Sequence, residues 1–203
     1  MVKLLNGYIV KQYIAKQYNN KTPMAKQLDK ILVIDLESTC WEGNPPEGQV
    51  SEIIEIGLCV LDVKTGKRED KEGILVKPTQ SEISPFCTQL TTITPEMIEN
   101  EGIDLQEACK ILKKKYASQQ RTWGSWGDYD RRQFERNCKM KEIGYPFGIT
   151  HINFKNLFAL KHKLDRELGL DMAAQMMNWE LEGTHHRGID DAWNIARLAA
   201  LLI

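Results

Sequence analysis

The amino-acid sequence predicts an α/β fold in which a mixed β-sheet is flanked by α-helices. Apolar, β-branched runs of strand length dominate the first part of the chain, and short apolar runs alternate with helical segments in the second part. Clusters of glycine, proline and asparagine separate these segments. Three consecutive strands followed by alternating strands and helices are typical of a mixed sheet with helices on its faces. The 203 residues suit one domain with a sizeable core.

The first three strands are expected to follow one another closely. The run Ile-Leu-Val-Ile at 31–34 predicts a buried strand that ends in the tripeptide Asp-Leu-Glu. A loop must follow at 41–49, because this stretch holds two prolines and two glycines. The next two strands, at 52–62 and 73–77, are expected to form a hairpin around the turn sequence at 64–67.

Helix signals mark much of the remaining chain. Thr94 followed by Pro95 indicates a helix start, because threonine caps a helix and proline fits its first position. The strongly apolar segment 189–202 is expected to be the terminal helix. The other elements expected in chain order are a helix at 104–116, a strand at 122–126, a helix at 128–143, a strand at 150–154 and helices at 156–168 and 171–179.

The beginning of the chain differs in charge from the rest. Residues 1–30 hold six lysines and one acidic residue, whereas the remainder holds more acidic than basic residues and the net charge is −1. We therefore expect a basic N-terminal extension at 1–29 and one domain at 30–203. A helical docking segment or a flexible end is favoured for the extension over a basic arm that binds nucleic acid.

Composition excludes several classes of protein. Apolar residues make up 42% and charged residues 27% of the chain, which is ordinary for a soluble domain. No apolar run approaches the roughly 20 residues that span a membrane, and no secretory signal is indicated. The five cysteines form no Cys-x-x-Cys pair, so neither a zinc site nor a disulfide framework is expected. We expect an intracellular, cytoplasmic protein that does not enter membranes.

Acidic residues at the end of the first strand are the first sign of chemistry. Asp35 and Glu37 are two apart on a strand, so their side chains point to the same face. Like charges repel there unless a cation or a retained proton neutralises them. Oxygen ligands of this kind suit Mg²⁺ or Mn²⁺. Taken alone, the pair also fits an ordinary strand end with a solvated glutamate, because Asp-x-Glu is a frequent tripeptide.

Two further segments place acidic residues at helix starts. Asp128 is expected to cap the helix after the fourth strand, and Asp130 to project near the end of that strand. His186 and Asp191 flank four residues just before the last helix, where an imidazole can accept a proton from a metal-bound water. Ordinary alternatives remain open, since acidic residues favour helix N-termini and a histidine can lie in a surface loop.

The order of these segments is more specific than any one of them. Asp-x-Glu, a mid-chain aspartate and His-x-x-x-x-Asp resemble the motifs of the DEDDh 3′–5′ exonuclease superfamily, which has a ribonuclease H-like fold. Within it the chain is similar to the Eri-type branch, which includes the 3′ histone mRNA exonuclease, and to bacterial sporulation-inhibitor-like relatives. The resemblance covers about residues 30–203 and rests further on segments 33–46, 52–55, 86–94 and 188–197.

Carried onto this sequence, the resemblance implies two divalent ions, Mg²⁺ or Mn²⁺, in one active site. It makes His186 the general base. The metal ligands that it implies are Asp35, Glu37, Asp130 and Asp191.

The second motif departs from the pattern of the branch, which usually has Trp-Asp at this place. Here the sequence is Trp126-Gly127-Asp128-Tyr129-Asp130. Alignment on Phe134 selects Asp130 as the ligand, whereas alignment on Trp126 points nearer to Asp128. We prefer Asp130, because an aromatic residue directly precedes it and its helical spacing to Phe134 is kept.

The resemblance also implies a pocket for the terminal nucleotide. Its lining residues are expected to be Leu36, Ser38, Leu90 and Thr91. The two leucines would sandwich a base and Ser38 would bind the terminal sugar, although both leucines also fit ordinary core positions. Trp41 and Trp126 are candidate stacking surfaces, although aromatic residues are more often core.

We therefore expect a metal-dependent 3′–5′ exonuclease that releases 5′ mononucleotides from single-stranded 3′ ends. RNA is the expected substrate, with DNA left open, and stacking without base reading would favour single strands. One alternative is a catalytically weak nucleic-acid-binding module that keeps the fold. A second is a DNA-preferring, proofreading-type exonuclease. The sequence identifies neither the physiological substrate nor a protein partner.

Overall fold

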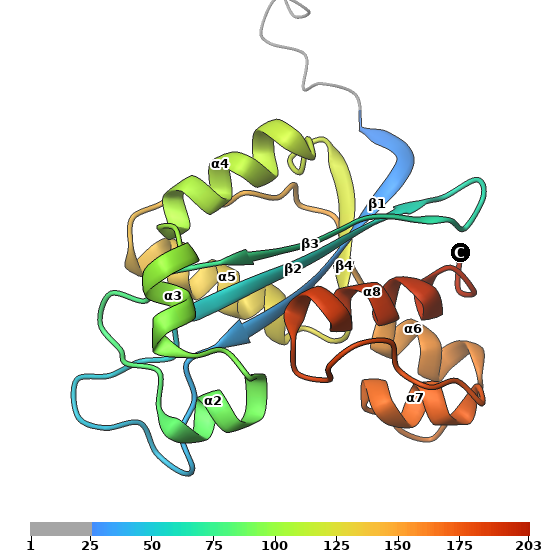
Figure 1. Ribbon diagram of the computed structural model, residues 1–203. Coiled ribbons are helices and arrows are strands. Elements are labelled where there is room, and N and C mark those ends of the chain that lie inside the picture. Colours follow the sequence, from blue (N-terminus) through green and yellow to red (C-terminus); the bar gives the residue numbers. More distant parts are fainter. Residues whose placement is uncertain (1–25) are drawn as a thin grey trace, which may run out of the picture.

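The computed structural model describes residues 26–203, which form a five-stranded mixed sheet with helices packed on both faces (Figure 1). The strand order across the sheet is β3-β2-β1-β4-β5. β1 pairs with β2 antiparallel and with β4 parallel, so the central strand joins the two halves of the sheet. The strands are β1 Gln27–Ser38, β2 Ile53–Asp62, β3 Arg68–Leu75, β4 Arg121–Ser125 and β5 His151–Asn153.

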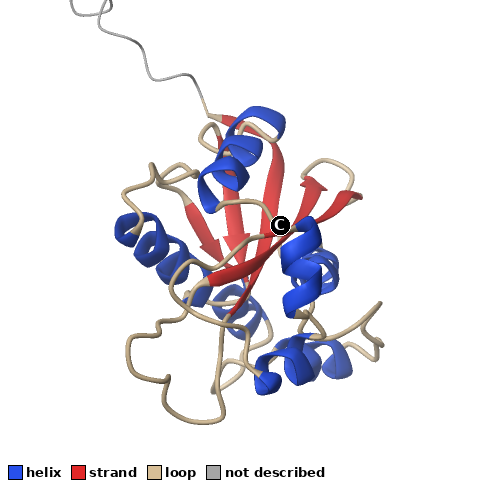
Figure 2. Ribbon diagram, turned by 60° about the vertical axis from the view of Figure 1, so that its left-hand side comes forward, coloured by secondary structure: helices blue, strands red, loops and turns tan. Residues whose placement is uncertain are grey.

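Helices cover the two faces in two groups, which the turned view separates clearly (Figure 2). On one face, α4 and α5 pack over Leu32, Ile34 and Leu36 of β1. On the other face, α6, α7 and α8 pack over Ile31 and Val33. The helices are α2 Pro85–Thr91, α3 Pro95–Glu101, α4 Leu105–Lys115, α5 Tyr129–Met140, α6 Phe154–Lys161, α7 Leu170–Met176 and α8 Gly188–Ala199.

Two helices at the end of the sheet begin with the same short signal. Thr94 caps α3 as predicted, since its side chain accepts a hydrogen bond from the backbone N–H of Met97. Ser84 caps α2 in the same way and is followed by Pro85. The Ser-Pro signal was present in the sequence, yet α2 was not among the expected elements.

The mixed sheet and the order of its strands along the chain are confirmed, and apart from the unexpected α2 the differences lie at element ends. β3 is longer than the expected strand at 73–77, because its pairing with β2 continues back to Arg68. α6 begins before the expected 156–168, since the side chain of Asn153 accepts from the backbone N–H of Asn156 and so starts the helix earlier. It ends at Lys161 rather than at 168. Lys163 has a left-handed φ of 53°, which is incompatible with a right-handed helix.

The expectations for residues 1–25 lie outside the described residues, and the boundary between the extension and the domain stays a prediction. β1 begins at Gln27, so the described chain enters the sheet almost at once. Within residues 26–203, none of the helices combines the length and the apolar character that crossing a membrane requires.

Candidate active site

The alternation of β1 explains how the first two carboxylates reach one place. Ile31 and Val33 point to the face covered by α8, so Asp35 and Glu37 point to that same face as the strand continues. Glu37 is 9% exposed and Asp35 is half-buried. The sequence expectation that both carboxylates converge is therefore confirmed by the register of the strand.

Asp191 reaches the pair from the first turn of α8. Carboxylate oxygens of Asp35, Glu37 and Asp191 all lie within 4.8 Å of one another. Asp191 is 4% exposed and accepts a hydrogen bond of 2.9 Å from the backbone N–H of His186. Three closely spaced hard oxygen donors are a suitable set for a divalent cation such as Mg²⁺ or Mn²⁺.

Asp130 approaches from the opposite face of the sheet, at the start of α5. Its side chain is 4% exposed and accepts a hydrogen bond of 2.9 Å from the backbone N–H of Leu36, between the first two carboxylates. All four carboxylates line one cavity of about 280 Å³, which we call the carboxylate cavity. Its lining residues are Asp35, Leu36, Glu37, Trp126, Tyr129, Asp130, Leu170, His185, His186 and Asp191.

Asp128 does not line this cavity. Its side chain is 38% exposed and lies 3.5 Å from Arg131, 3.9 Å from Arg132 and 3.8 Å from His151. The expectation that Asp128 caps α5 is wrong, because its side chain makes no capping hydrogen bond although it occupies the cap position. Of the two candidates for the second motif, the structure brings Asp130 to the other carboxylates.

Burial and mutual repulsion hold protons on this cluster. Burial is the main reason why the pKa of Asp35 lies well above its ordinary value, and the carboxylates of Asp130 and Asp191 add to the shift. Burial and the charge of Asp191 raise the pKa of Glu37 to about 9, and burial raises the pKa of Asp130 to about 7. Neutralisation by a cation would release these protons, so the cluster is built to exchange protons for metal.

A testable consequence is that the metal-free protein should lose stability as pH rises from 7 to 9. Glu37 has a raised pKa in the folded state, so above pH 7 the folded protein binds more protons than the unfolded chain. The free energy of unfolding must then fall as pH increases. Carboxylates with lowered pKa values, such as Glu52, contribute fully throughout this range and do not oppose the trend.

Urea denaturation at pH 7, 8 and 9 in excess chelator measures this slope. The matched control is Glu37→Gln, which removes one raised group and should flatten the dependence. A free energy of unfolding that stays constant or rises over this range in the unaltered protein would contradict the electrostatic description of the cluster.

The two histidines before α8 both line the carboxylate cavity. The ring of His185 places Nδ1 3.1 Å from each carboxylate oxygen of Asp191, and the His185 and His186 rings stack with their centroids 4.0 Å apart. His186 has a left-handed φ of 65°, a conformation that histidine tolerates better than most residues. His185 lacks the four-residue spacing to Asp191 that singled out His186, yet its ring contacts this candidate metal ligand.

The environment keeps His186 able to accept a proton. Burial lowers the pKa of His186 below its ordinary value, and the neighbouring His185 lowers it further. The imidazole is therefore neutral near pH 7, as a general base must be.

A buried ion pair positions the loop that carries these histidines. Glu55 of β2 is 1% exposed and faces Glu37 across the strand pair. Its carboxylate accepts hydrogen bonds from the Arg187 guanidinium, at 2.9 and 3.2 Å, and from the backbone N–H of Gly188 at 2.8 Å. These contacts fix the start of α8 against the sheet, and hence the position of Asp191.

Glycine makes this close approach possible. A Cβ atom on Gly57, which pairs with Asp35, would lie only 1.8 Å from the carbonyl oxygen of Gly188. Any larger residue at position 57 would push the start of α8 away from the carboxylates.

The residues expected to hold the terminal nucleotide have different surroundings. Leu36 lines the carboxylate cavity but is 5% exposed and belongs to the core, whereas Leu90 is 37% exposed on α2 and does not line that cavity. The hydroxyl of Ser38 is buried and finds no hydrogen-bond partner among the described residues, and Ser38 does not line the carboxylate cavity. Thr91 is fully buried, and its hydroxyl donates to the Cys87 carbonyl and accepts from the Ile93 N–H.

Thr91 thus has a structural role at the end of α2, and its assignment to the substrate rests on the resemblance alone.

Of the two tryptophans, Trp126 lines the cavity while its indole N–H donates to the Leu168 carbonyl at 3.0 Å. Sequence reasoning missed Tyr129, which is 55% exposed at the edge of the cavity. The aromatic residue directly before Asp130 was the available signal.

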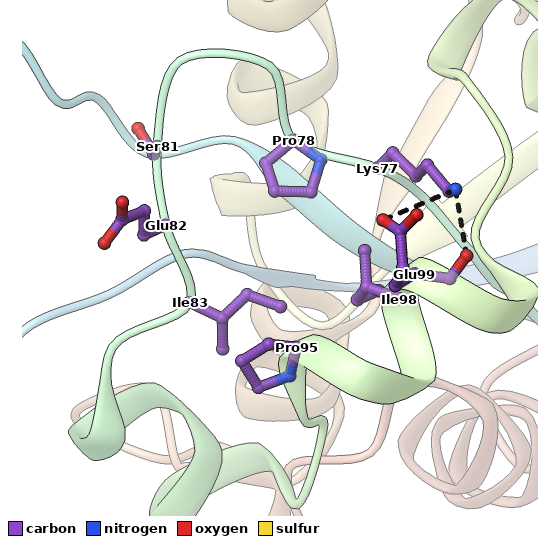
Figure 3. Close-up of a pocket in the computed structure, with 8 residues that line it drawn as sticks. All are labelled: Lys77, Pro78, Ser81, Glu82, Ile83, Pro95, Ile98 and Glu99. Atoms are coloured by element: carbon purple, nitrogen blue, oxygen red, sulfur yellow. Dashed lines mark hydrogen bonds and ion pairs between the residues drawn. The ribbon is translucent and has the colours of Figure 1, made fainter.

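A second, larger cavity lies away from this cluster (Figure 3). It measures about 350 Å³ and is bounded by the loop after β3 and by α3, with Ile83 and Pro95 among its apolar walls. Lys77 reaches over to Glu99 of α3, where its ammonium group donates to the backbone carbonyl at 2.9 Å. None of the candidate catalytic residues lines it, so the carboxylate cavity is the candidate active site.

Comparison with known proteins places the chain among nucleases. The sequence model of the family described as Exonuclease (RNase_T) matches residues 32–199. The chain is 32% identical over 213 residues to human 3′-5′ exoribonuclease 1, and the alignment covers 99% of this chain and 59% of that protein. The likeness therefore reaches into residues 1–29, beyond the expected 30–203. The chain spans about three fifths of the length of this relative.

Solved structures agree with these sequence matches. The nuclease domain of 3′hExo, described as a DEDDh family member bound to rAMP, superposes with a TM-score of 0.77 and 30% identity, covering 87% of this chain and 92% of that one. A 3′-exonuclease that recognises the histone mRNA stem-loop gives a TM-score of 0.75 and 30% identity, covering 85% and 80%. These likenesses confirm the predicted ribonuclease H-like sheet flanked by helices.

Proposed function

Since this chain belongs to the exonuclease family of the RNase_T type, we propose that it is a metal-dependent enzyme that trims single-stranded RNA from its 3′ end. The observation that carries the proposal is the convergence of Asp35, Glu37, Asp130 and Asp191 with His186 on one cavity. These residues come from three separate segments of the chain and from both faces of the sheet. Burying four carboxylates close together destabilises the folded protein, so such a cluster indicates a catalytic use.

Each group in the cavity has a role that its surroundings support. The four carboxylates would hold two divalent ions, Mg²⁺ or Mn²⁺, which supply charge stabilisation for the phosphodiester and make water a better nucleophile. His186 accepts the proton of the attacking water, because its pKa is lowered and its ring lines the cavity. His185 and the Glu55–Arg187 pair orient Asp191 and the loop before α8.

The substrate end would be held beside the carboxylates. Ser38 offers its unpartnered hydroxyl to the terminal sugar, and Leu36 offers an apolar wall to the base. Leu90 and Thr91 complete the pocket in the proposal, Leu90 by its exposed side chain and Thr91 by supporting the end of α2. RNA is preferred over DNA because the relatives over most of this chain are described as exoribonucleases.

Digestion of end-labelled oligonucleotides tests the proposal. Single-stranded RNA with a 5′ label should be shortened stepwise with release of 5′ mononucleotides, and an inverted nucleotide at the 3′ end should block the reaction. DNA of the same sequence and duplexes with blunt ends should react more slowly. Faster digestion of DNA would favour the proofreading-type exonuclease. Binding of the oligonucleotides without turnover in Mn²⁺ would favour the catalytically weak nucleic-acid-binding module.

Replacement of His186 is expected to slow the chemical step with little loss of stability. His186→Asn keeps a residue that accepts the left-handed φ but removes the proton acceptor, so the single-turnover rate should fall about 10²–10⁴-fold. Binding of single-stranded RNA should survive, because the carboxylates and the Ser38 hydroxyl remain. Rates measured at saturating Mg²⁺ check the expectation.

The variant His185→Asn serves as the comparison, although His185 itself contacts a candidate metal ligand. Its ring contacts both oxygens of Asp191, so its loss should raise the metal concentration needed for half-maximal rate more than it lowers the rate at saturation. If His185→Asn is inactive at saturating metal while His186→Asn cleaves normally, the assignment of the general base is wrong.

A further inference from the structure

One face of α5 carries an aromatic residue and three cations in a row. Tyr129, Arg132, Arg136 and Lys139 are spaced by three, four and three residues, so they lie on one side of the helix. All four side chains are exposed. We call these four residues the α5 stripe.

The α5 stripe begins at the carboxylate cavity. Tyr129 lines that cavity, and the next residue is the candidate ligand Asp130. From Tyr129 the helix leads away along the sheet face, and ten residues at 1.5 Å per residue carry Lys139 to about 15 Å from it. The three cations therefore form a path that starts where hydrolysis is proposed to occur.

Within residues 26–203, the cations of the α5 stripe are not committed to strong ion pairs. Arg132 is 74% exposed and lies 3.9 Å from Asp128, a separation at which a surface pair contributes little. Arg136 contacts the neutral amide oxygen of Gln133. Lys139 makes no ion pair with any residue in the range 26–203. The neighbouring Glu135 lies 3.8 Å from Arg131 instead.

The lysines of α4 show the contrasting, ordinary case. Lys110 pairs with Glu107 at 2.9 Å, Lys113 donates to the Gly144 carbonyl at 2.9 Å, and Lys115 pairs with Glu72. Most of the positive charge on α4 is thus used within the protein. The charge on the α5 stripe is available to an external anion.

We propose that the α5 stripe binds the phosphate backbone of the substrate strand upstream of its 3′ end. The proposal rests on the proposed function, because the polyanion that occupies the cavity is the one whose continuation would follow the helix. From Arg132 to Lys139 the stripe is about 10 Å long, which is long enough to contact at least two consecutive phosphates of the substrate strand. The contacts are to the backbone, so they raise affinity without selecting a sequence.

The test compares substrates with and without an upstream backbone. The stripe variant is Arg132→Gln/Arg136→Gln, and the matched control is Lys110→Gln/Lys114→Gln, which also removes two cations four residues apart on an exposed helix face. Each protein is assayed in Mn²⁺ with the p-nitrophenyl ester of a nucleoside 5′-monophosphate and with single-stranded RNA of increasing length. KM and kcat are measured at several salt concentrations.

With long RNA, the stripe variant should show a KM raised about tenfold and an unchanged kcat. Two lost phosphate contacts should make the slope of log(kcat/KM) against log salt shallower by about 1.4, at roughly 0.7 per contact with a single strand. The ester lacks upstream phosphates, so its hydrolysis should be the same in the stripe variant, the control and the unaltered protein.

Two outcomes separate the inference from the function on which it rests. If the unaltered protein hydrolyses the ester and RNA, but the stripe variant keeps the KM and salt slope of the α4 control, the inference is overturned and the function stands. If the unaltered protein hydrolyses neither substrate, the proposed function fails. Equal losses in the stripe variant and the α4 control would show a general effect of net charge and would also overturn the inference.

Discussion

Removal of divalent metal ions is expected to abolish hydrolysis of single-stranded RNA completely. In the metal-free protein, burial and repulsion raise the pKa of Asp35 and Glu37, so these groups hold protons near neutral pH. The charge that a cation lends to the transition state is worth roughly several kcal/mol, and the described cavity offers nothing else of that strength. His186 alone is a base without an electrophilic partner.

Protein treated with excess chelator and then titrated with Mg²⁺ or Mn²⁺ gives the measurement. Activity should return with either ion, and the concentration needed for half-maximal rate should fall as pH rises from 6 to 8, because protons compete with metal for Glu37 and Asp130. Glu37→Gln should need more metal at every pH. Full activity in chelator would refute the metal-dependent mechanism.

The sequence predicts best those features that depend on local geometry. The two-residue period of a strand is enough to place Asp35 and Glu37 on one face, and β1 confirms it. Thr94-Pro95 marks a helix start for the same reason, since capping depends on neighbouring residues only. The order of the motifs, which resembles that of a known family, then predicts that these separate segments form one site.

Contacts between distant segments are not available from such patterns. The approach of α8 to the sheet depends on Gly57 opposite Gly188, and on the Glu55 carboxylate that binds Arg187. The contact of His185 with Asp191 forms in a loop whose next residue, His186, has a left-handed backbone that spacing alone does not reveal. Spacing to Asp191 alone therefore selected one histidine and missed the contact made by the other.

The surroundings of Thr91 show the same limit on the substrate side. Its place in a family motif suggests a role in binding, but the hydroxyl is already engaged at the end of α2, a helix that was not anticipated. Burial and hydrogen bonding decide whether a polar side chain is available, and both depend on the tertiary fold.

Asp130→Asn is expected to abolish turnover, whereas Asp128→Asn should leave it nearly unchanged. Asp130 is buried in the carboxylate cavity, and asparagine keeps its shape and can still accept from the Leu36 N–H. The substitution removes one negative charge from the cluster that would hold the ions. A loss of roughly 10³-fold or more is expected, which corresponds to about 4 kcal/mol of transition-state stabilisation.

The free energy of unfolding of the Asp130→Asn variant distinguishes a loss of catalysis from misfolding. Burial raises the pKa of Asp130 to about 7, so the neutral asparagine removes a desolvation cost, and the metal-free variant should unfold at the same free energy or a higher one. Asp128→Asn weakens exposed contacts with two arginines, worth about 1 kcal/mol or less, and the 3.8 Å contact with His151, but it removes no helix cap.

Single-turnover rates on labelled single-stranded RNA in saturating Mn²⁺, with urea denaturation of each variant, provide the comparison. If Asp128→Asn is the inactive protein and Asp130→Asn cleaves normally, the second motif must be aligned on Trp126 instead. The start of α5 would then have to rotate on metal binding to bring Asp128 into the carboxylate cavity, and the hydrogen bond between Asp130 and Leu36 would have to break. The buried position of Asp130 and that hydrogen bond are therefore the two structural reasons for expecting the opposite result.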